Sequence, residues 1–270
     1  MKKATWNYYL AQTWNTYLPP IRPYLEELLI IKQQITEFIT NNSLKPKVLI
    51  LGSTPELRDI LYEFDIQPTV IDYRKENYMV MSELLNKKGV DRFVEMNWLD
   101  MAFDKEFDII LSEAAFNVVP YNTIKELYKR IYKSLKDDGL LIAKNWVRFS
   151  NVCPSLDKLI KEYRSCNKNI GFYSYTCIPL MLCFYDYSME CIKVRTLSHK
   201  CKELFRNNLI NELEWESISI HNYEEVDLHI YIPLIHDFIN DINPHFEISK
   251  IFDIKIAHSE YHPLFILKKI

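Results

Sequence analysis

Four places in the sequence carry polar side chains directly after a short apolar run. They are Gly52-Ser53-Thr54, Asp72-Tyr73, Asn97-Trp98 and Ser112-Glu113. Ligands of open parallel sheets bind beyond the carboxyl ends of the strands, so these residues are the candidates for chemistry. Their carboxylates, amide, hydroxyls and aromatic rings could hydrogen-bond a sugar and stack on a flat ring.

Asp72 lies twenty residues beyond Gly52. A carboxylate at the end of a second strand can accept hydrogen bonds from both ribose hydroxyls of an adenosine, in NAD enzymes and in adenosylmethionine enzymes alike. A pyrophosphate needs several glycines for its close approach to the backbone. Residues 52–57 contain one glycine, and Glu56 stands near the start of the next helix, where it would repel phosphate. The loop therefore favours an adenosyl ligand without phosphates.

Short, β-rich apolar runs bounded by turn residues predict the elements that position these side chains. Buried strands are expected at 47–52, 68–72, 92–96, 107–112 and 140–144, and an antiparallel pair at 246–256 and 263–268. Helices should begin at Thr54 as N-cap, run over 76–87, and follow Asn122 as N-cap with Gly139 as the closing glycine. This alternation predicts an α/β fold with a doubly wound, mostly parallel seven-stranded sheet.

Composition restricts the partners and the compartment. The chain has 270 residues, a net charge of −3 and no broad basic stretch, which argues against nucleic acid. No run of 18 apolar residues or secretory leader is recognisable, so we expect a cytoplasmic protein without a membrane partner. All six cysteines fall within 153–201 without zinc-type spacing, which predicts reduced thiols and no metal site.

Taken together, residues 47–146 and 246–270 resemble a class I S-adenosylmethionine-dependent methyltransferase. The run from Val48 to Gly52 resembles the first motif of that family, and Val70 to Tyr73 resembles the acidic second motif. Residues 97–103, 107–112 and 135–142 resemble the adenine-contact segment, the fourth strand and the turn into the fifth strand. The first loop has the form G-x-T-P-E, with a single glycine where the family usually has three.

The resemblance implies S-adenosyl-L-methionine as cofactor, with methyl transfer to a small organic acceptor. The implied cofactor-binding residues are Gly52, Ser53, Thr54, Asp72, Tyr73, Asn97, Trp98, Ser112 and Glu113. Tyr9 and Trp14 are candidates for contact with the acceptor from an N-terminal lid, although aromatic side chains in such a helix more often belong to a core. The sequence identifies no catalytic residue and no oligomeric state.

The expected organisation has three parts: an N-terminal helical cap over 1–45, the cofactor-binding core over 46–150 and 246–270, and a helical insertion over 151–245. The insertion should shape the acceptor pocket, and its aromatic residues favour an apolar or aromatic acceptor. These aromatic residues include Phe172, Tyr173, Tyr175, Phe184 and Tyr185. Two alternatives stay open. One is a peptide or protein methyltransferase, and the other is a non-catalytic module that retains the fold, which the single-glycine loop keeps in consideration.

Overall fold

The computed structural model describes residues 13–166, 170–221, 223–252, 254 and 257–270. The strands are β1 (Val48–Leu51), β2 (Thr69–Asp72), β3 (Arg92–Glu95), β4 (Phe107–Glu113), β5 (Leu135–Lys144), β6 (Ile192–Lys193), β7 (His229–Ile230), β8 (Phe246–Phe252) and β9 (Leu264–Lys269). The α-helices are α2 (Leu25–Asn42), α3 (Pro55–Glu63), α4 (Lys75–Ser82), α5 (Tyr121–Ser134), α6 (Leu156–Ser165), α7 (Phe172–Cys183), α8 (Val194–Arg206), α9 (Glu212–Ser219) and α10 (Ile235–Ile242).

Seven strands form one sheet in the order β3-β2-β1-β4-β5-β9-β8. The pairs from β3 to β5 are parallel, whereas β9 is antiparallel to both β5 and β8. The order reverses between β1 and β4, which places the switch point, where ligands bind in such sheets, at the ends of these two strands. The predicted doubly wound sheet and its antiparallel pair are confirmed.

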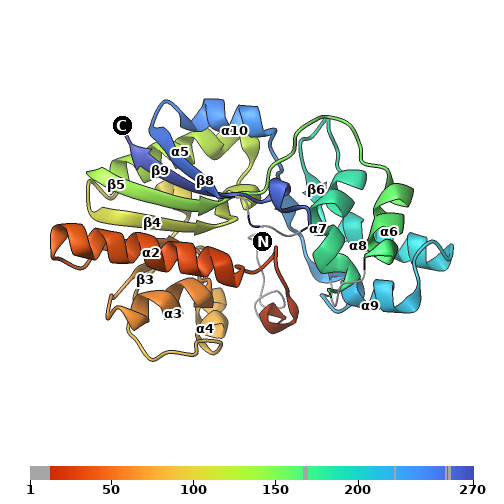
Figure 1. Cartoon of the computed structure of the whole chain (residues 1–270), viewed down its shortest axis with the longest axis horizontal. Coiled ribbons are helices and arrows are strands. Elements are labelled where there is room, and N and C mark those ends of the chain that lie inside the picture. Colours follow the sequence, from red (N-terminus) through yellow and green to blue (C-terminus); the bar gives the residue numbers. More distant parts are fainter. Residues whose placement is uncertain (1–12, 167–169, 222, 253, 255–256) are drawn as a thin grey trace.

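Alternate residues of the sheet enter two separate hydrophobic cores, because successive side chains of a strand point to opposite faces. Leu49, Leu51 and Ile110 pack with residues of α5 and α10 on one face. Val48 and Ile50 pack with residues of α2 and α3 on the other. Helices thus cover both faces of the sheet (Figure 1). The near-continuous apolar runs of the central strands follow from this double burial.

A third core holds the helical unit formed by α6, α7, α8 and α9, which lies to one side of the sheet (Figure 1). Residues 13–24, the described part of the chain before α2 and called the N-terminal segment from here on, join this core through Trp14 and Tyr17. Trp146, two residues beyond the end of β5, belongs to the same core. In contrast, α10 contributes Phe238 and Ile242 to the sheet core, although it lies within the expected insertion. The N-terminal segment therefore connects the helical unit to the edge of the sheet.

Two predicted helix signals on α5 are wrong. The helix begins at Tyr121, before Asn122, because Pro120 occupies the N-cap position with its backbone fixed near the helical entry geometry. The helix ends at Ser134, and Gly139 lies inside β5 instead of closing the helix. Leu135 turns to extended geometry and pairs with Phe107, so the strand starts five residues earlier than the predicted residue 140.

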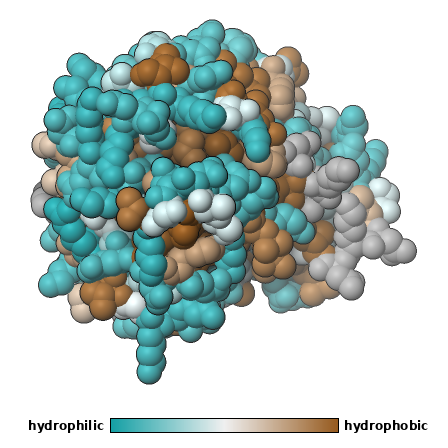
Figure 2. Space-filling view, turned by 60° about the vertical axis from the view of Figure 1, so that its left-hand side comes forward, coloured by the Kyte–Doolittle hydropathy of each residue, from teal (hydrophilic) through white to brown (hydrophobic). Residues whose placement is uncertain are grey.

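The face shown in Figure 2 is largely hydrophilic, with groups of hydrophobic side chains visible between the hydrophilic ones. Within the described ranges, no helix combines the length and the apolar character needed to cross a membrane.

The predicted helix over 76–87 is shorter in the structure and spans Lys75–Ser82.

Candidate functional site

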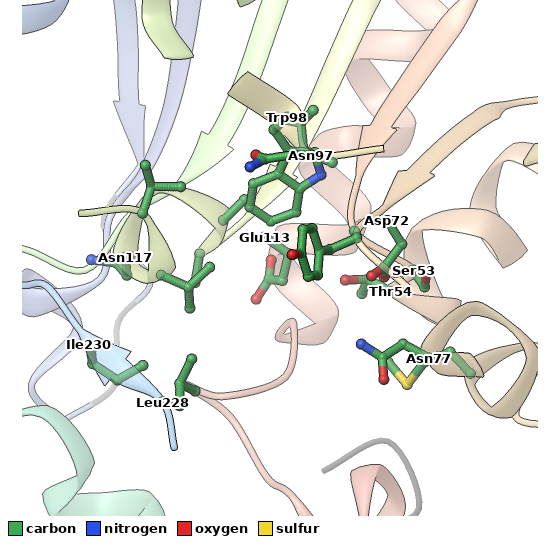
Figure 3. A pocket seen from close by; sticks show the side chains of 18 of the residues that line it. Ser53, Thr54, Asp72, Asn77, Asn97, Trp98, Glu113, Asn117, Leu228 and Ile230 are labelled. Atoms are coloured by element: carbon green, nitrogen blue, oxygen red, sulfur yellow. Dashed lines mark hydrogen bonds between the residues drawn. The ribbon is translucent and has the colours of Figure 1, made fainter. Parts of the chain in front are cut away.

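A cavity of about 310 Å³ opens where the carboxyl ends of β1, β2 and β4 meet (Figure 3). This volume is at the lower end of the range of small-molecule sites. Its walls come from the carboxyl edge of the sheet with the residues that follow its strands, from α4, from the N-terminal segment and from the residues around β7. The sequence-predicted members of its lining are Trp14, Gly52, Ser53, Thr54, Asp72, Tyr73, Asn97, Trp98 and Glu113. The cavity thus brings together residues that lie far apart in the sequence.

Gly52 ends β1 in a conformation that other residues rarely adopt. Its φ is +94°, and its N–H donates to the Ile71 carbonyl of the neighbouring strand at 2.8 Å. An added Cβ would meet only the Trp98 ring, at an ordinary distance of 3.8 Å. Glycine is therefore required here by the backbone angle, not by crowding.

Asp72 ends β2 and is fixed by hydrogen bonds before any ligand is present. Ser53 Oγ donates to its Oδ2 at 2.6 Å, and the Arg74 N–H donates to its Oδ1 at 3.3 Å. Burial raises the pKa of the Asp72 carboxyl group, while the Ser53 hydrogen bond opposes that rise. Both carboxylate oxygens have acceptor capacity left, since each oxygen can accept more than one hydrogen bond.

Asn97 and Trp98 form the start of a short turn, η2 (Trp98–Asp100). The Asn97 side-chain oxygen caps this turn by accepting from the Leu99 N–H at 3.0 Å. Trp98 Nε1 donates to the Ile71 carbonyl at 3.0 Å, which holds the indole beside Gly52. The capping bond leaves the Asn97 amide NH₂ and one lone pair of its oxygen for other partners.

Glu113 ends β4, and its side chain is only 5% exposed. Lys144, at the end of β5, donates to Glu113 Oε1 at 2.7 Å and to Glu27 Oε2 of α2 at 3.2 Å. Burial raises the pKa of Glu113 to about 8, against the opposing charge of Lys144. Burial would lower the pKa of Lys144, but the two carboxylates outweigh it and raise that pKa.

Ser112, the other predicted residue of this strand end, does not line the cavity. It is buried, and its hydroxyl has no hydrogen-bond partner among the described residues. Since side chains alternate along a strand, Ser112 and Glu113 must point to opposite faces of the sheet. Only Glu113 faces the cavity.

The N-terminal segment covers one side of the cavity through Trp14. Trp14 is buried, and its Nε1 donates to Glu56 Oε1 at 3.2 Å. Arg22 Nε donates to the same oxygen at 2.7 Å. Glu56, at the start of α3, thus binds two side chains of the N-terminal segment, Trp14 and Arg22. Tyr9, the other predicted acceptor residue, lies outside the described residues.

The remaining wall is apolar and was not predicted in detail. Its members include Met81, Val118, Trp146, Leu228 and Ile230. Two asparagines also line the cavity without having been predicted, Asn77 on α4 and Asn117 after β4. Asn117 donates to the Trp146 and Tyr231 carbonyls at 2.9 and 2.7 Å, and thereby fixes the strand end to the chain before α10. No sequence signal distinguished these asparagines from ordinary loop residues.

The aromatic residues of 172–185, from which an apolar or aromatic acceptor was expected, lie away from the cavity, while Leu228 and Ile230 of the same insertion line it. None of Phe172, Tyr173, Tyr175, Phe184 and Tyr185 lines the cavity. The helix α7 is apolar on all sides and is buried at the centre of the helical unit, where its aromatic rings pack against one another and the neighbouring helices.

The described cavity lining has acidic side chains and no basic ones. Among the described lining residues none is Lys, Arg or His, and the two ionisable carboxyl groups are Asp72 and Glu113. Over the described part of the chain, no group of three or more His, Cys, Asp or Glu side chains is placed to hold a metal ion.

Residues 52–143 match the family model of the methyltransferase domain. A comparison with curated proteins found no match. Among solved structures, a protein of Pyrococcus horikoshii matches with a TM-score of 0.53 at 12% identity, over 95% of this chain and 98% of that one. The N-methyltransferase NodS from Bradyrhizobium japonicum, in complex with S-adenosylhomocysteine, matches with a TM-score of 0.50 at 10% identity, over 97% of both chains.

A Rhodobacter sphaeroides protein provisionally named as a zinc-dependent alcohol dehydrogenase also matches, with a TM-score of 0.58 at 14% identity over 96% of this chain and 95% of that one. Likeness at such identities concerns the fold alone, so the named activities of these proteins do not transfer. The sheet order is that of the class I methyltransferase fold. With the domain match, it supports S-adenosylmethionine-dependent methyl transfer as the activity and S-adenosylmethionine as the cofactor.

Proposed function

We propose that the protein transfers the methyl group of S-adenosylmethionine to a small, apolar or aromatic organic acceptor. The observation that carries this proposal is a single cavity that joins an adenosine-type edge to an apolar wall. Asp72, Trp98 and Gly52 line one part of it, and Trp146, Leu228 and Ile230 line another. The distribution of groups matches what a large adenosyl cation and a small apolar partner would each need.

The residues at the sheet edge fit the cofactor. The Asp72 oxygens would accept from the ribose hydroxyls, and Trp98 with Asn97 would contact the adenine ring by its face and its polar edge. Tyr73 and the loop Gly52-Ser53-Thr54 would border the same molecule, with Glu113 at the strand end nearest its methionine part. When bound, the cofactor supplies an activated methyl group on a sulfonium.

The contribution of the chain to the reaction would be orientation and the exclusion of water. Trp14, which Glu56 holds over the cavity, and the residues around β7 enclose the acceptor end. Holding two reactants in line removes several kcal/mol from a bimolecular barrier. A dry site also protects the sulfonium from side reactions. The acceptor role of Trp14 belongs to this proposal, as does that of Tyr9.

The division into a cap over 1–45, a core over 46–150 with 246–270, and an insertion over 151–245 is part of the same proposal. So are a cytoplasmic location and the absence of nucleic-acid and membrane partners, which rest on the composition of the chain.

A transfer assay tests the proposal. The protein is incubated with S-adenosylmethionine and a panel of small aromatic amines, phenols and thiols, and products are analysed for the mass of one added methyl group. We expect product with the wild type, strong reduction with Asp72→Ala, and no change with Asp104→Ala, which removes an exposed carboxyl group outside the cavity lining. Cofactor binding without transfer to any of them would restrict the proposal to another acceptor class, and absence of cofactor binding would favour the non-catalytic module.

A further inference from the structure

The Glu113 carboxyl group is an ionisable group of the described cavity lining that the adenosine-type contacts leave unused. It points into the space between Asp72 and Ser53 on one side and Asn117, Leu228 and Ile230 on the other (Figure 3). Its Oε1 receives the Lys144 hydrogen bond, whereas its Oε2 has no partner among the described residues. A carboxylate oxygen that faces an enclosed cavity keeps its acceptor capacity for a ligand that enters the cavity.

The charge balance around Glu113 is incomplete. One cation, Lys144, serves two carboxylates, because Glu27 Oε2 is also within 3.2 Å of its Nζ. Glu56 on α3 is a further carboxylate near enough to raise the pKa of Glu113, although Arg22 pairs with it at 2.5 Å. The Tyr24 ring packs over Lys144 at 5.5 Å and brings no charge of its own. The described cavity lining contains no Lys, Arg or His that could neutralise a second carboxylate, so Glu113 favours its protonated form until another cation arrives.

We propose that Glu113 Oε2 binds a positively charged nitrogen of a ligand in this cavity. The inference deepens the proposed function, because it states the chemistry that one of the two reactants must present at the junction between them. An ammonium group has two possible sources here. One is the amino group of the methionine part of the cofactor, and the other is an amine acceptor seated against Trp14, Trp146, Leu228 and Ile230.

Binding of such a cation should release a proton. Because burial raises the pKa of Glu113 to about 8, the group is mostly protonated at pH 7 in the free protein. An ammonium beside it favours the carboxylate and lowers that pKa, so the proton leaves as the cation arrives. The effect should fade as the pH of the solution rises beyond 8.

Two calorimetric arms separate the two sources. In the first arm, the free protein is titrated with S-adenosylhomocysteine and with methylthioadenosine, which lacks the amino-acid part. In the second arm, the protein saturated with S-adenosylhomocysteine is titrated with tryptamine and with tryptophol, its neutral alcohol counterpart. Each titration is run at pH 7 in buffers of different ionisation enthalpy, so that proton release is counted with the affinity.

We expect the wild type to prefer the ammonium-bearing member of at least one pair and to release a proton with it. Glu113→Gln should reduce that preference about tenfold or more, the scale of a charge-assisted hydrogen bond, and abolish the proton release. Glu27→Gln is the matched control. It removes the other carboxylate on Lys144 without touching the cavity lining, and should keep the preference.

If Glu113→Gln loses the preference for S-adenosylhomocysteine over methylthioadenosine, Glu113 binds the amino group of the cofactor. If it loses the preference for tryptamine over tryptophol, Glu113 binds the amine of the acceptor. The proposal is overturned if Glu113→Gln changes neither ratio. It is also overturned, without need of any variant, if the wild type shows neither a cation preference nor proton release. If the wild type fails to bind S-adenosylhomocysteine and methylthioadenosine, the proposed function fails, and the second arm on the free protein still tests Glu113.

Discussion

Ser53 and Asp72 show how a loop with few glycines can still support an adenosine-type site. Beside the single Gly52, Ser53 supplies a hydroxyl that holds the Asp72 carboxylate at 2.6 Å. The carboxylate therefore keeps its orientation without ligand, which reduces the entropy lost on binding. A side chain at position 54, where a loop with three glycines has its second one, is compatible with an adenosyl ligand because the loop does not have to admit a pyrophosphate.

Gly52→Ala should destabilise the protein by about 1–3 kcal/mol, because φ of +94° is strained for any residue with a Cβ. The free energy of unfolding in urea measures this effect. Gly171→Ala is the control, since Gly171 has an ordinary φ of −62° and its added Cβ would lie 3.9 Å from the nearest side-chain atom. Equal stability of the two variants would contradict the role assigned to the Gly52 backbone.

At the scale of residues, the sequence was informative where a strand end and a side-chain type coincide. Gly52, Asp72, Trp98 and Glu113 all line the cavity, because a buried apolar run places its next residue at the sheet edge. Ser112 does not line the cavity. The end of an apolar run shows where a strand stops, but it does not show which of the last two side chains points toward the ligand side of the sheet. Asn77 and Asn117 could not be predicted, because their neighbours in space come from distant segments.

Among the elements, the N-terminal end of α2 is bound to the sheet through a buried cation. Lys144 on β5 contacts Glu27 in the first turn of α2, Glu113 on β4 and the Arg22 carbonyl at 3.1 Å. Its side chain is fully buried. One lysine thus joins two strands, one helix and the segment that covers the cavity, so the position of this segment depends on it.

Lys144→Met should destabilise the protein by about 3–5 kcal/mol, because it leaves two buried carboxyl groups without the cation that both contact. Thermal and urea unfolding check this expectation. Lys105→Met serves as the comparison, since Lys105 pairs with Asp137 on the surface and its loss should have little effect on stability. A wild-type-like unfolding curve for Lys144→Met would show that the ion pairs do not hold these elements together.

The contact between the N-terminal segment and the helical unit contains a buried histidine. The His221 ring stacks on Tyr17 with centroids 4.3 Å apart, and the rings of Tyr173 and Tyr223 also pack near it. Burial lowers the pKa of His221 to about 4. Between pH 4 and 6.5 the His221 imidazole is therefore protonated in the unfolded chain and neutral in the folded protein. The free energy of unfolding consequently decreases as the pH of the solution falls through this range.

His221→Phe should remove this dependence, since phenylalanine keeps the stacking and does not titrate. The slope of unfolding free energy against pH between 4 and 6.5 should be smaller than that of the wild type by up to about one proton. His236→Phe, at an exposed position on α10, should leave the slope unchanged. An unchanged slope in His221→Phe would contradict the burial of a neutral imidazole at this contact.

Element boundaries were less predictable than the elements themselves. The strands were found because doubly buried strands form short continuous apolar runs, as Val48–Leu51 does. The end of α5 was misplaced because Gly139 resembles a helix-closing glycine, while pairing of Leu135 with Phe107 starts the strand earlier. Tertiary pairing of this kind overrides the local signal.

In the whole molecule, the order of the strands in the sheet determines where the cavity lies. Crossing from β3 through β1 to β4 places the ends of separate segments around one cavity, and the N-terminal segment with the residues around β7 closes its other side. The order of the elements was predictable from the alternation of strands and helices. The residues that form the acceptor wall were not, because the aromatic stretch 172–185 stabilises the helical unit and leaves the wall to Trp146, Leu228 and Ile230.

The central claim is that this cavity binds S-adenosylmethionine through Asp72, and calorimetric titration with S-adenosylmethionine and S-adenosylhomocysteine tests it most directly. We predict micromolar or tighter binding to the wild type, retained in Asp104→Ala and lost in Asp72→Ala with its unfolding temperature preserved. Absence of binding to the folded wild type, or equal binding to the Asp72→Ala variant, would contradict the claim.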